Sequence, residues 1–107
     1  MILKYDIDIQ DTAVYVNLSR LTNQIYKLLP CREEGSDWEK PLATLMEEIS
    51  GLFRLLPDHH ETLFPLLCKM EGLFTLEDDS MFFEYRRTIF ECLNLMGTLQ
   101  RECQCQE

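Results

Sequence analysis

The first ten residues alternate between apolar and polar side chains. The apolar set is Leu3, Tyr5, Ile7 and Ile9, and the polar set between them is Lys4, Asp6, Asp8 and Gln10. A period of two is typical of a half-buried β-strand. The rest of the chain offers no second run of this period, so the backbone groups of the predicted strand must bond to water, a loop or another chain. We therefore expect residues 1–10 to form an arm that completes a dimer or docks on a partner.

From residue 11 onward the apolar positions recur every three or four residues, which predicts amphipathic helices. Four such stripes follow one another. Their expected core positions are Val14, Leu18, Leu21, Ile25 and Leu28; Leu42, Leu45, Met46, Ile49, Leu52, Phe53 and Leu56; Leu63, Leu66, Leu67, Met70, Leu73 and Phe74; and Phe82, Tyr85, Ile89, Cys92, Leu93, Met96 and Leu99. Each helix has one face to bury, and four helices can bury these faces against one another.

Prolines and capping residues mark the expected ends of these helices. Asp11 or Thr12 is expected to start the first helix and Leu29 to end it, because Pro30 interrupts helical hydrogen bonding. The stretch PCREEGSD is then expected to be a loop. The expected caps of the later helices are Ser36 with Glu39, Asp58 with Glu61, and Asp79 or Ser80.

Pro65 lies inside the third stripe and leaves two alternatives open. Either that helix begins a few residues after Asp58, or a kink interrupts it near Thr62. The short connections favour antiparallel neighbours. We predict a mainly α fold: a small antiparallel bundle of about four helices with a short N-terminal β-strand. It forms one domain over residues 1–107, with the arm at 1–10, the bundle at 11–101 and a frayed tail at 102–107.

The chain is strongly acidic, with ten Lys and Arg against nineteen Asp and Glu and a formal net charge of −9. Direct binding to DNA or RNA is not expected, because affinity for phosphates comes from clustered Lys and Arg. An acidic surface instead keeps a protein soluble or steers it toward a basic partner. No apolar run is long enough for a membrane span, and the odd number of cysteines behind a start unlike a signal peptide favours the reducing cytoplasm.

The histidines and cysteines offer little catalytic or metal-binding chemistry. His59 and His60 are adjacent, so on a helix they point about 100° apart and cannot share one metal ion; we expect them in a solvated first turn. Cys103 and Cys105 lack the C-x-x-C spacing of structural zinc sites. No histidine is placed to serve as the base of a cysteine nucleophile. We expect no enzymatic activity, no catalytic residue, no metal and no cofactor.

The candidate binding residues are side chains that the core stripes do not use. Phe64, Phe83 and Phe90 fall off the core stripes and leave apolar area that a protein partner or self-association would cover. Trp38 either staples the second helix onto the bundle or contacts a partner. Arg86 and Arg87 either form exposed ion pairs along their helix or anchor an interface.

Two stretches, LTNQIYKLLPCREEGSDWEKPL and YRRTIFECLNLMG, look like parts of small proteins of bacterial mobile elements and phages. In its overall character the chain resembles the compact inhibitors grouped as anti-CRISPR proteins. The resemblance implies a mode of action: binding a CRISPR nuclease, or its assembly, and blocking guide or DNA engagement. Some of these inhibitors mimic nucleic acid with an acidic surface. Asp6 and Asp8 on the predicted strand would project about 6.6 Å apart as such a pair of charges.

The function that we expect from the sequence is that of a non-enzymatic, cytoplasmic protein–protein interaction module. Its role would be to inhibit or regulate a nucleic-acid-handling complex. The alternative is a structural or assembly adaptor of a phage or mobile element with an apolar interface, whose complex would be insensitive to salt. The predicted partner-binding residues are Asp6, Asp8, Trp38, Asp78, Asp79, Phe83, Arg86, Arg87 and Phe90.

Overall fold

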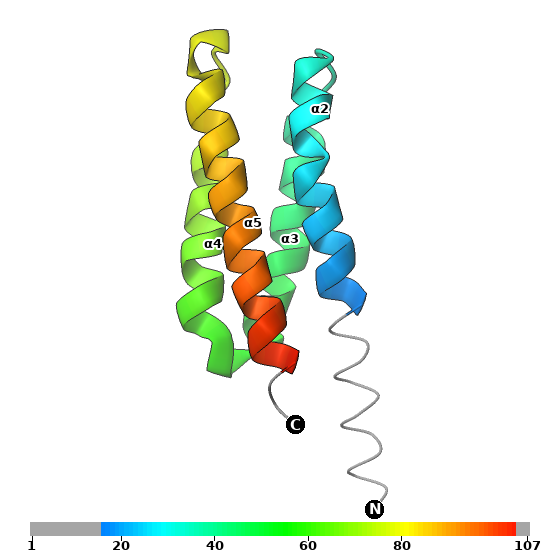
Figure 1. Cartoon of the computed structure of the whole chain (residues 1–107), viewed down its shortest axis with the longest axis vertical. Helices are drawn as coiled ribbons and strands as arrows, with labels where there is room; N and C mark the ends of the chain where they lie inside the picture. Colours follow the sequence, from blue (N-terminus) through cyan, green and yellow to red (C-terminus); the bar gives the residue numbers. More distant parts are fainter. Residues whose placement is uncertain (1–15, 105–107) are drawn as a thin grey trace, which may run out of the picture.

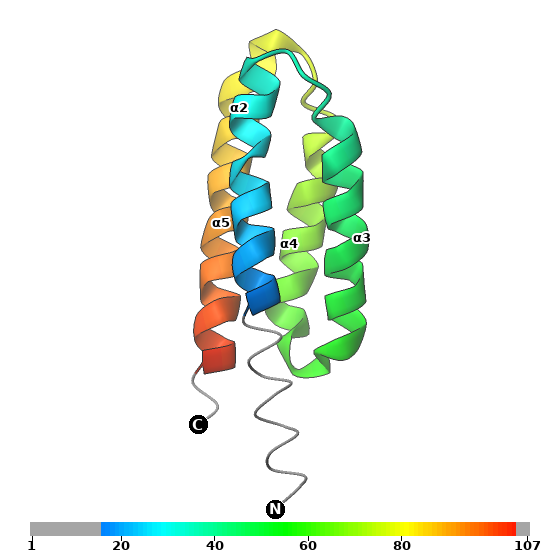
Figure 2. The ribbon, with the colours of Figure 1, turned by 90° about the vertical axis from the view of Figure 1, so that its right-hand side faces the viewer.

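The computed structural model describes residues 16–104, with side chains through Glu102, and its helices pack side by side along their length (Figures 1 and 2). Residues 16–26 are helical and lead into α2 (Leu28–Glu33), α3 (Glu39–Leu55), the 3-10 turn η1 (Pro57–His59), α4 (His60–Leu73), the 3-10 turn η2 (Asp79–Met81) and α5 (Phe82–Gln104). Successive helices run in opposite directions (Figure 1). The predicted antiparallel bundle of four helices is confirmed. The strand predicted at residues 1–10 lies outside the described residues, and residues 16–104 contain no strand.

One hydrophobic core joins the four predicted stripes. Its buried members are Leu18, Leu21, Ile25, Leu28, Leu29, Trp38, Leu42, Leu45, Ile49, Leu52, Leu63, Leu66, Met70, Leu73, Tyr85, Ile89, Cys92, Met96 and Leu99. The other predicted positions from Met46 onward are partly buried and pack against this cluster. Burying one such aliphatic side chain contributes roughly 1.5–3 kcal/mol, so the match between stripes and core accounts for the fold. Leu29 and Trp38 join the core although the stripes do not include them.

The first helix continues past Pro30, so the predicted end at Leu29 is wrong. Pro30 has no N–H to offer to the carbonyl of Tyr26. The next residue restores the pattern, because the Cys31 N–H donates to the Lys27 carbonyl at 3.2 Å. One missing hydrogen bond interrupts the ladder without ending the helix.

α2 ends at Glu33, and Gly35, just beyond its C-cap Glu34, has a φ of +76° in the left-handed region that favours glycine. The Gly35 N–H donates to the Arg32 carbonyl and the Ser36 N–H donates to the Cys31 carbonyl, both at 3.0 Å. These two hydrogen bonds form a Schellman motif. The connection that was predicted as PCREEGSD is therefore confined to residues 34–38.

The helix caps are carboxylates next to the predicted residues. Asp37, and not Ser36, accepts hydrogen bonds from the first two N–H groups of α3, at 3.1 and 3.3 Å. Asp78, and not Asp79 or Ser80, caps η2, because its Oδ1 accepts from the N–H two residues further on at 3.2 Å. An ionised carboxylate also interacts more favourably than a hydroxyl with the positive end of the helix dipole.

α4 begins after Asp58, the residue that was predicted to cap it. The 3-10 turn Pro57–His59 comes first, and the helix begins at His60 with Pro65 inside it. Within the described residues neither element has a side-chain cap, so the predicted pairing of Asp58 with Glu61 is wrong.

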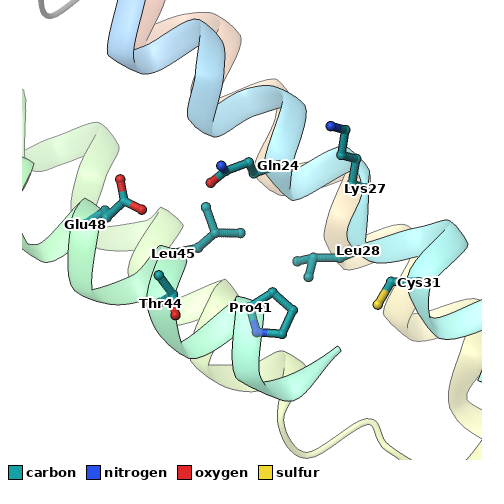
Figure 3. A pocket seen from close by; sticks show the side chains of 8 residues that line it. All are labelled: Gln24, Lys27, Leu28, Cys31, Pro41, Thr44, Leu45 and Glu48. Carbon is teal, nitrogen blue, oxygen red and sulfur yellow. The ribbon is translucent and has the colours of Figure 1, made fainter. Parts of the chain in front are cut away.

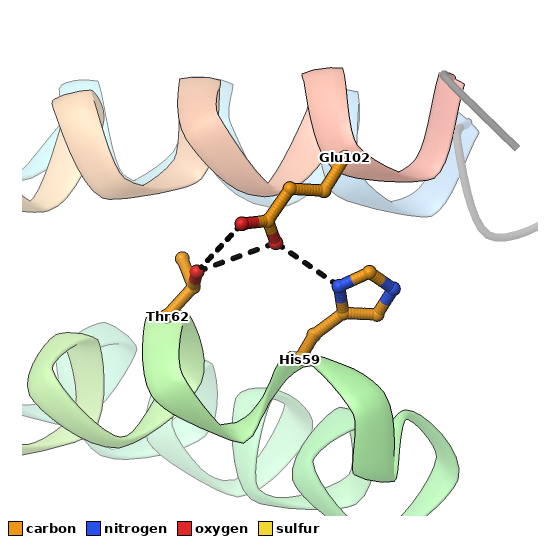
Figure 4. Close-up of polar contacts among 3 residues, drawn as sticks. All are labelled: His59, Thr62 and Glu102. Atoms are coloured by element: carbon orange, nitrogen blue, oxygen red, sulfur yellow. Dashed lines mark hydrogen bonds and ion pairs between the residues drawn. The ribbon is translucent and has the colours of Figure 1, made fainter.

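The far end of α5 is pinned to the start of α4 (Figure 4). Glu102 Oε1 lies 3.0 Å from His59 Nδ1, and the Thr62 hydroxyl donates to both carboxylate oxygens at 3.1 and 3.3 Å. α5 is helical to Gln104, and the rest of the tail predicted over residues 102–107 lies outside the described residues. His59 is also not solvated, since its side chain is only 10% exposed.

Candidate protein-binding surface

A groove runs between residues 26–33, which include α2, and the first turns of α5. Its first wall consists of Tyr26, Leu29, Pro30 and Glu33, and its second wall consists of Phe82, Phe83, Arg86 and Phe90. Its volume is about 610 Å³. We call this the aromatic groove. Three residues of its second wall were predicted from the sequence, and the bundle brings them against a segment that lies far earlier in the chain.

Three aromatic side chains of the groove are exposed to solvent. Phe83 is 81% exposed, Tyr26 54% and Phe90 40%. Single exposed apolar residues are ordinary on a protein surface, but aromatic residues that gather in one groove mark an interaction site. Tyr and other aromatic side chains are also favoured as anchors in protein interfaces.

The first wall of the groove has a signal in the sequence. Tyr26, Pro30 and Glu33 are spaced by four and three residues, so they form a second stripe beside the core stripe of the same helix. The predicted binding residues include apolar positions beside a core stripe only in the last helix, and for this reason the first wall was missed.

The two arginines of α5 have different roles. The Arg86 guanidinium lies 5.3 Å from the centre of the Phe90 ring, within the groove, in the geometry of a cation–π contact. Arg87 Nε lies 3.9 Å from an oxygen of Glu91, which also binds Lys69 at 3.1 Å. Arg87 therefore forms the exposed ion pair that was one of the two alternatives, and such pairs contribute about 0–1 kcal/mol. Arg86 remains a candidate for partner contact.

Trp38 belongs to the core and not to the exposed surface. It is only 8% exposed. Its ring meets the Tyr85 ring edge-on at a centroid distance of 4.9 Å and stacks on Phe74 at 6.4 Å. Of the two alternatives, the staple describes Trp38, and this corrects its prediction as a partner-binding residue.

Arg32 fastens the end of α2 to the connection between α4 and η2. Its guanidinium lies 4.3, 5.3 and 5.7 Å from the ring centres of Tyr85, Trp38 and Phe82. It donates to two carbonyl groups of that connection, one of them Asp78 O at 2.8 Å. Arg32 was not predicted as a key residue, because nothing in its neighbourhood along the chain indicates contacts with so distant a segment.

Arg32 brings two acidic connections together at one end of the bundle, the upper end in Figures 1 and 2. We call this the acidic end. Its exposed carboxylates are Glu33, Glu34, Asp37, Glu77, Asp78 and Asp79. Asp78 and Asp79 were predicted as partner-binding residues, and Asp6 and Asp8 lie outside the described residues. Glu33 belongs both to the acidic end and to the aromatic groove.

A second pocket, of about 460 Å³, lies between the first helix and α3 (Figure 3). It is lined by Gln24, Lys27, Leu28, Cys31, Pro41, Thr44, Leu45 and Glu48. Several of its polar groups are bonded within the chain: the Thr44 hydroxyl donates to the Lys40 carbonyl at 3.2 Å, and Glu48 pairs with Arg20. This pocket has none of the exposed aromatic side chains of the aromatic groove.

In the described part of the chain, no group of three or more His, Cys, Asp or Glu side chains could hold a metal ion. No helix within residues 16–104 is long and apolar enough to cross a membrane. No family model, no curated protein and no solved structure matches this chain. We therefore infer function from the residues and their geometry.

The buried thiol of Cys92 makes stability depend on pH in the alkaline range. Burial raises the pKa of Cys92 from 9.0 to about 12, although the nearby Lys69 lowers it. Because the folded protein holds this proton more tightly than the unfolded chain, the stabilisation is complete below pH 9 and is lost as the pH rises toward 12. Burial also raises the pKa of Tyr85 above its usual range, which adds to the effect at higher pH.

We expect the urea midpoint of unfolding to fall steadily between about pH 8.5 and about pH 10.5. The Cys68→Ala variant, which removes an exposed thiol, should keep this slope. In the Cys92→Ala variant, the urea midpoint should fall less at the lower end of this pH range, where the ionisation of Cys92 causes the loss of stability. A midpoint that is the same at both pH values would show that Cys92 ionises freely in the folded protein.

Proposed function

We propose that this chain is a non-enzymatic protein–protein interaction module and that its aromatic groove binds the partner. The exposure of Phe83, Tyr26 and Phe90 in one groove is the observation that supports this proposal. Leaving such area in water is unfavourable by roughly 25 cal/mol per Å², so a partner that covers it gains affinity from the burial. Aromatic and arginine side chains, which this groove combines, are the usual energetic centres of interfaces.

We further propose that the partner is a basic protein of a nucleic-acid-handling complex, which this chain inhibits or regulates. The net charge of −9 and the carboxylates gathered at the acidic end support this part. Proteins that bind DNA or RNA carry clustered Lys and Arg, and an acidic surface attracts them and competes with the nucleic acid. The anti-CRISPR type of inhibitor, with a CRISPR nuclease as the target, remains a prediction from the sequence resemblance.

The aromatic groove also supports the alternative function, that of a structural or assembly adaptor. In that case apolar contacts would carry the affinity, and the complex would be as stable in high salt as in low salt. An inhibitor that is attracted to a basic protein would bind less tightly as salt rises. The salt dependence of the captured complex distinguishes the two functions.

The proposal can be tested with a photocrosslinking amino acid at position 83. The same replacement at Phe64, which is 61% exposed on α4, is the matched control because Phe64 does not line the groove. In cells that encode this chain, we expect position 83 to give a crosslinked protein of defined mass that position 64 does not give. No crosslink at position 83, or the same products from both positions, would contradict the proposed function.

A further inference from the structure

We propose that the segment bound in the aromatic groove is an amphipathic helix of the partner, with apolar anchors in the groove and basic residues against the acidic end. This inference rests on the proposed function, because it takes the groove as a protein-docking surface. It adds the secondary structure, the charge pattern and the placement of the bound segment.

The shape of the groove favours a helix. Its walls extend from Tyr26 to Glu33 and from Phe82 to Phe90. At 1.5 Å per residue these stretches are about 10–12 Å long, which corresponds to two helical turns. A third helix can lay one apolar stripe between two helical walls, as in a helix-in-groove complex. An added β-strand would need an open sheet edge, and neither wall is a strand.

Charge is distributed unevenly along the groove, and this fixes how the bound helix is placed. Glu33 stands at the end of the groove that joins the acidic end, with Glu34 and Asp79 exposed beyond it. Arg86 lies further along α5, over the ring of Phe90. A helix with basic residues at one end of its apolar stripe places them at the acidic end and keeps them away from Arg86. Charge complementarity of this kind selects the partner and speeds association.

A second copy of the chain fits this groove less well. If the two-fold axis of a dimer ran parallel to the helices, it would bring two acidic ends side by side. If the axis ran across the helices, it would bring the middle of the α5 wall, where Arg86 lies, against the Arg86 of the other copy. Both arrangements place like charges opposite each other, which disfavours association.

The test uses two synthetic helical peptides with the same apolar stripe of leucines at positions i, i+3, i+4 and i+7. One peptide has three lysines directly after the stripe, and the other has three glutamates there. We expect the chain of residues 1–107 to bind the lysine peptide at least about tenfold more tightly than the glutamate peptide in fluorescence anisotropy at low salt. This difference should shrink as the salt concentration rises.

Variants of the protein then test separately the apolar contact in the groove and the charge contact at the acidic end. Phe83→Ala should weaken the lysine peptide about tenfold or more, whereas Phe64→Ala should leave its affinity unchanged. Glu34→Gln combined with Asp79→Asn should reduce the preference for lysine over glutamate several-fold. The matched control is Glu47→Gln combined with Glu61→Gln, which removes the same charge from α3 and α4 and should have a smaller effect. All four residues are exposed, so the variants are expected to fold, as circular dichroism can confirm.

Several outcomes would overturn this inference. The first is that neither peptide binds, and the second is that both bind equally at low salt. The third is a dimer of this chain in sedimentation that Phe83→Ala dissociates, which would show that a second copy fills the groove. In each case the crosslinking experiment at position 83 still decides separately whether the groove binds a protein at all.

Discussion

Replacing Trp38 by alanine is expected to lower the free energy of unfolding by about 3–5 kcal/mol. Trp38 is buried between the rings of Phe74 and Tyr85 and beneath the Arg32 guanidinium. The substitution removes the buried apolar area of the indole ring. It also removes the edge-to-face contact with Tyr85 and the ring on which the Arg32 guanidinium packs. The cavity that it leaves adds to the cost, because the helices around it can collapse only in part.

The measurement is urea unfolding followed by circular dichroism, with Phe83→Ala as the matched control. Phe83 has an aromatic ring too, but it is 81% exposed, so its removal should change the free energy of unfolding by no more than about 0.5 kcal/mol. Trp38→Ala should therefore lower stability, whereas Phe83→Ala should leave stability unchanged and weaken binding. If Trp38→Ala kept full stability and abolished partner binding, Trp38 would belong to the binding surface after all.

Replacing Arg32 by alanine is expected to lower the free energy of unfolding by about 2–3 kcal/mol. The guanidinium donates two hydrogen bonds to carbonyl groups of the α4–η2 connection and packs against three aromatic rings. Without it, those carbonyls lose a charged donor. The buried hydroxyl of Tyr85 has no hydrogen-bond partner among the described residues.

The Arg32→Lys variant tests whether the planar shape of the guanidinium matters. Lysine keeps the charge but cannot direct two N–H groups in a fixed fork while it stacks on the rings, so we expect it to recover less than half of the loss. Arg87→Ala removes an exposed arginine of α5 and should change stability by less than about 0.5 kcal/mol. Full recovery by lysine would mean that charge alone fastens the connection.

Arg32 also links stability to the proposed function. The contact that it makes with the α4–η2 connection holds Asp78 and Asp79 beside Glu33 and Glu34. A variant at Arg32 that still folds should therefore lose part of its preference for basic ligands, because the acidic end would no longer be held together. The arrangement of the acidic end thus depends on the Arg32 guanidinium.

The bundle and its core follow from the pattern of residues along the chain. Spacing of three and four residues defines the buried face of a helix, and the predicted stripes from Leu18 to Leu99 became that core. The pattern is local, so it can be followed without knowing how the helices meet. It also separated Phe83 and Phe90 from the core before their surroundings were known. The helix ends were harder, because the competing bonds at Pro30 and Asp37 involve neighbouring backbone groups that spacing does not describe.

Which exposed residues act together depends on how the helices pack. The aromatic groove joins Tyr26 and Pro30 to Phe83 and Phe90, and the acidic end joins two connections that Arg32 bridges. The same packing buried Trp38, whereas the contacts of Arg86 and Arg87 lie within α5 itself. The physical reason is that a helical sequence specifies which face is apolar, but the helix that covers this face is chosen by contacts between distant segments. A surface made of two such segments does not exist until they have packed.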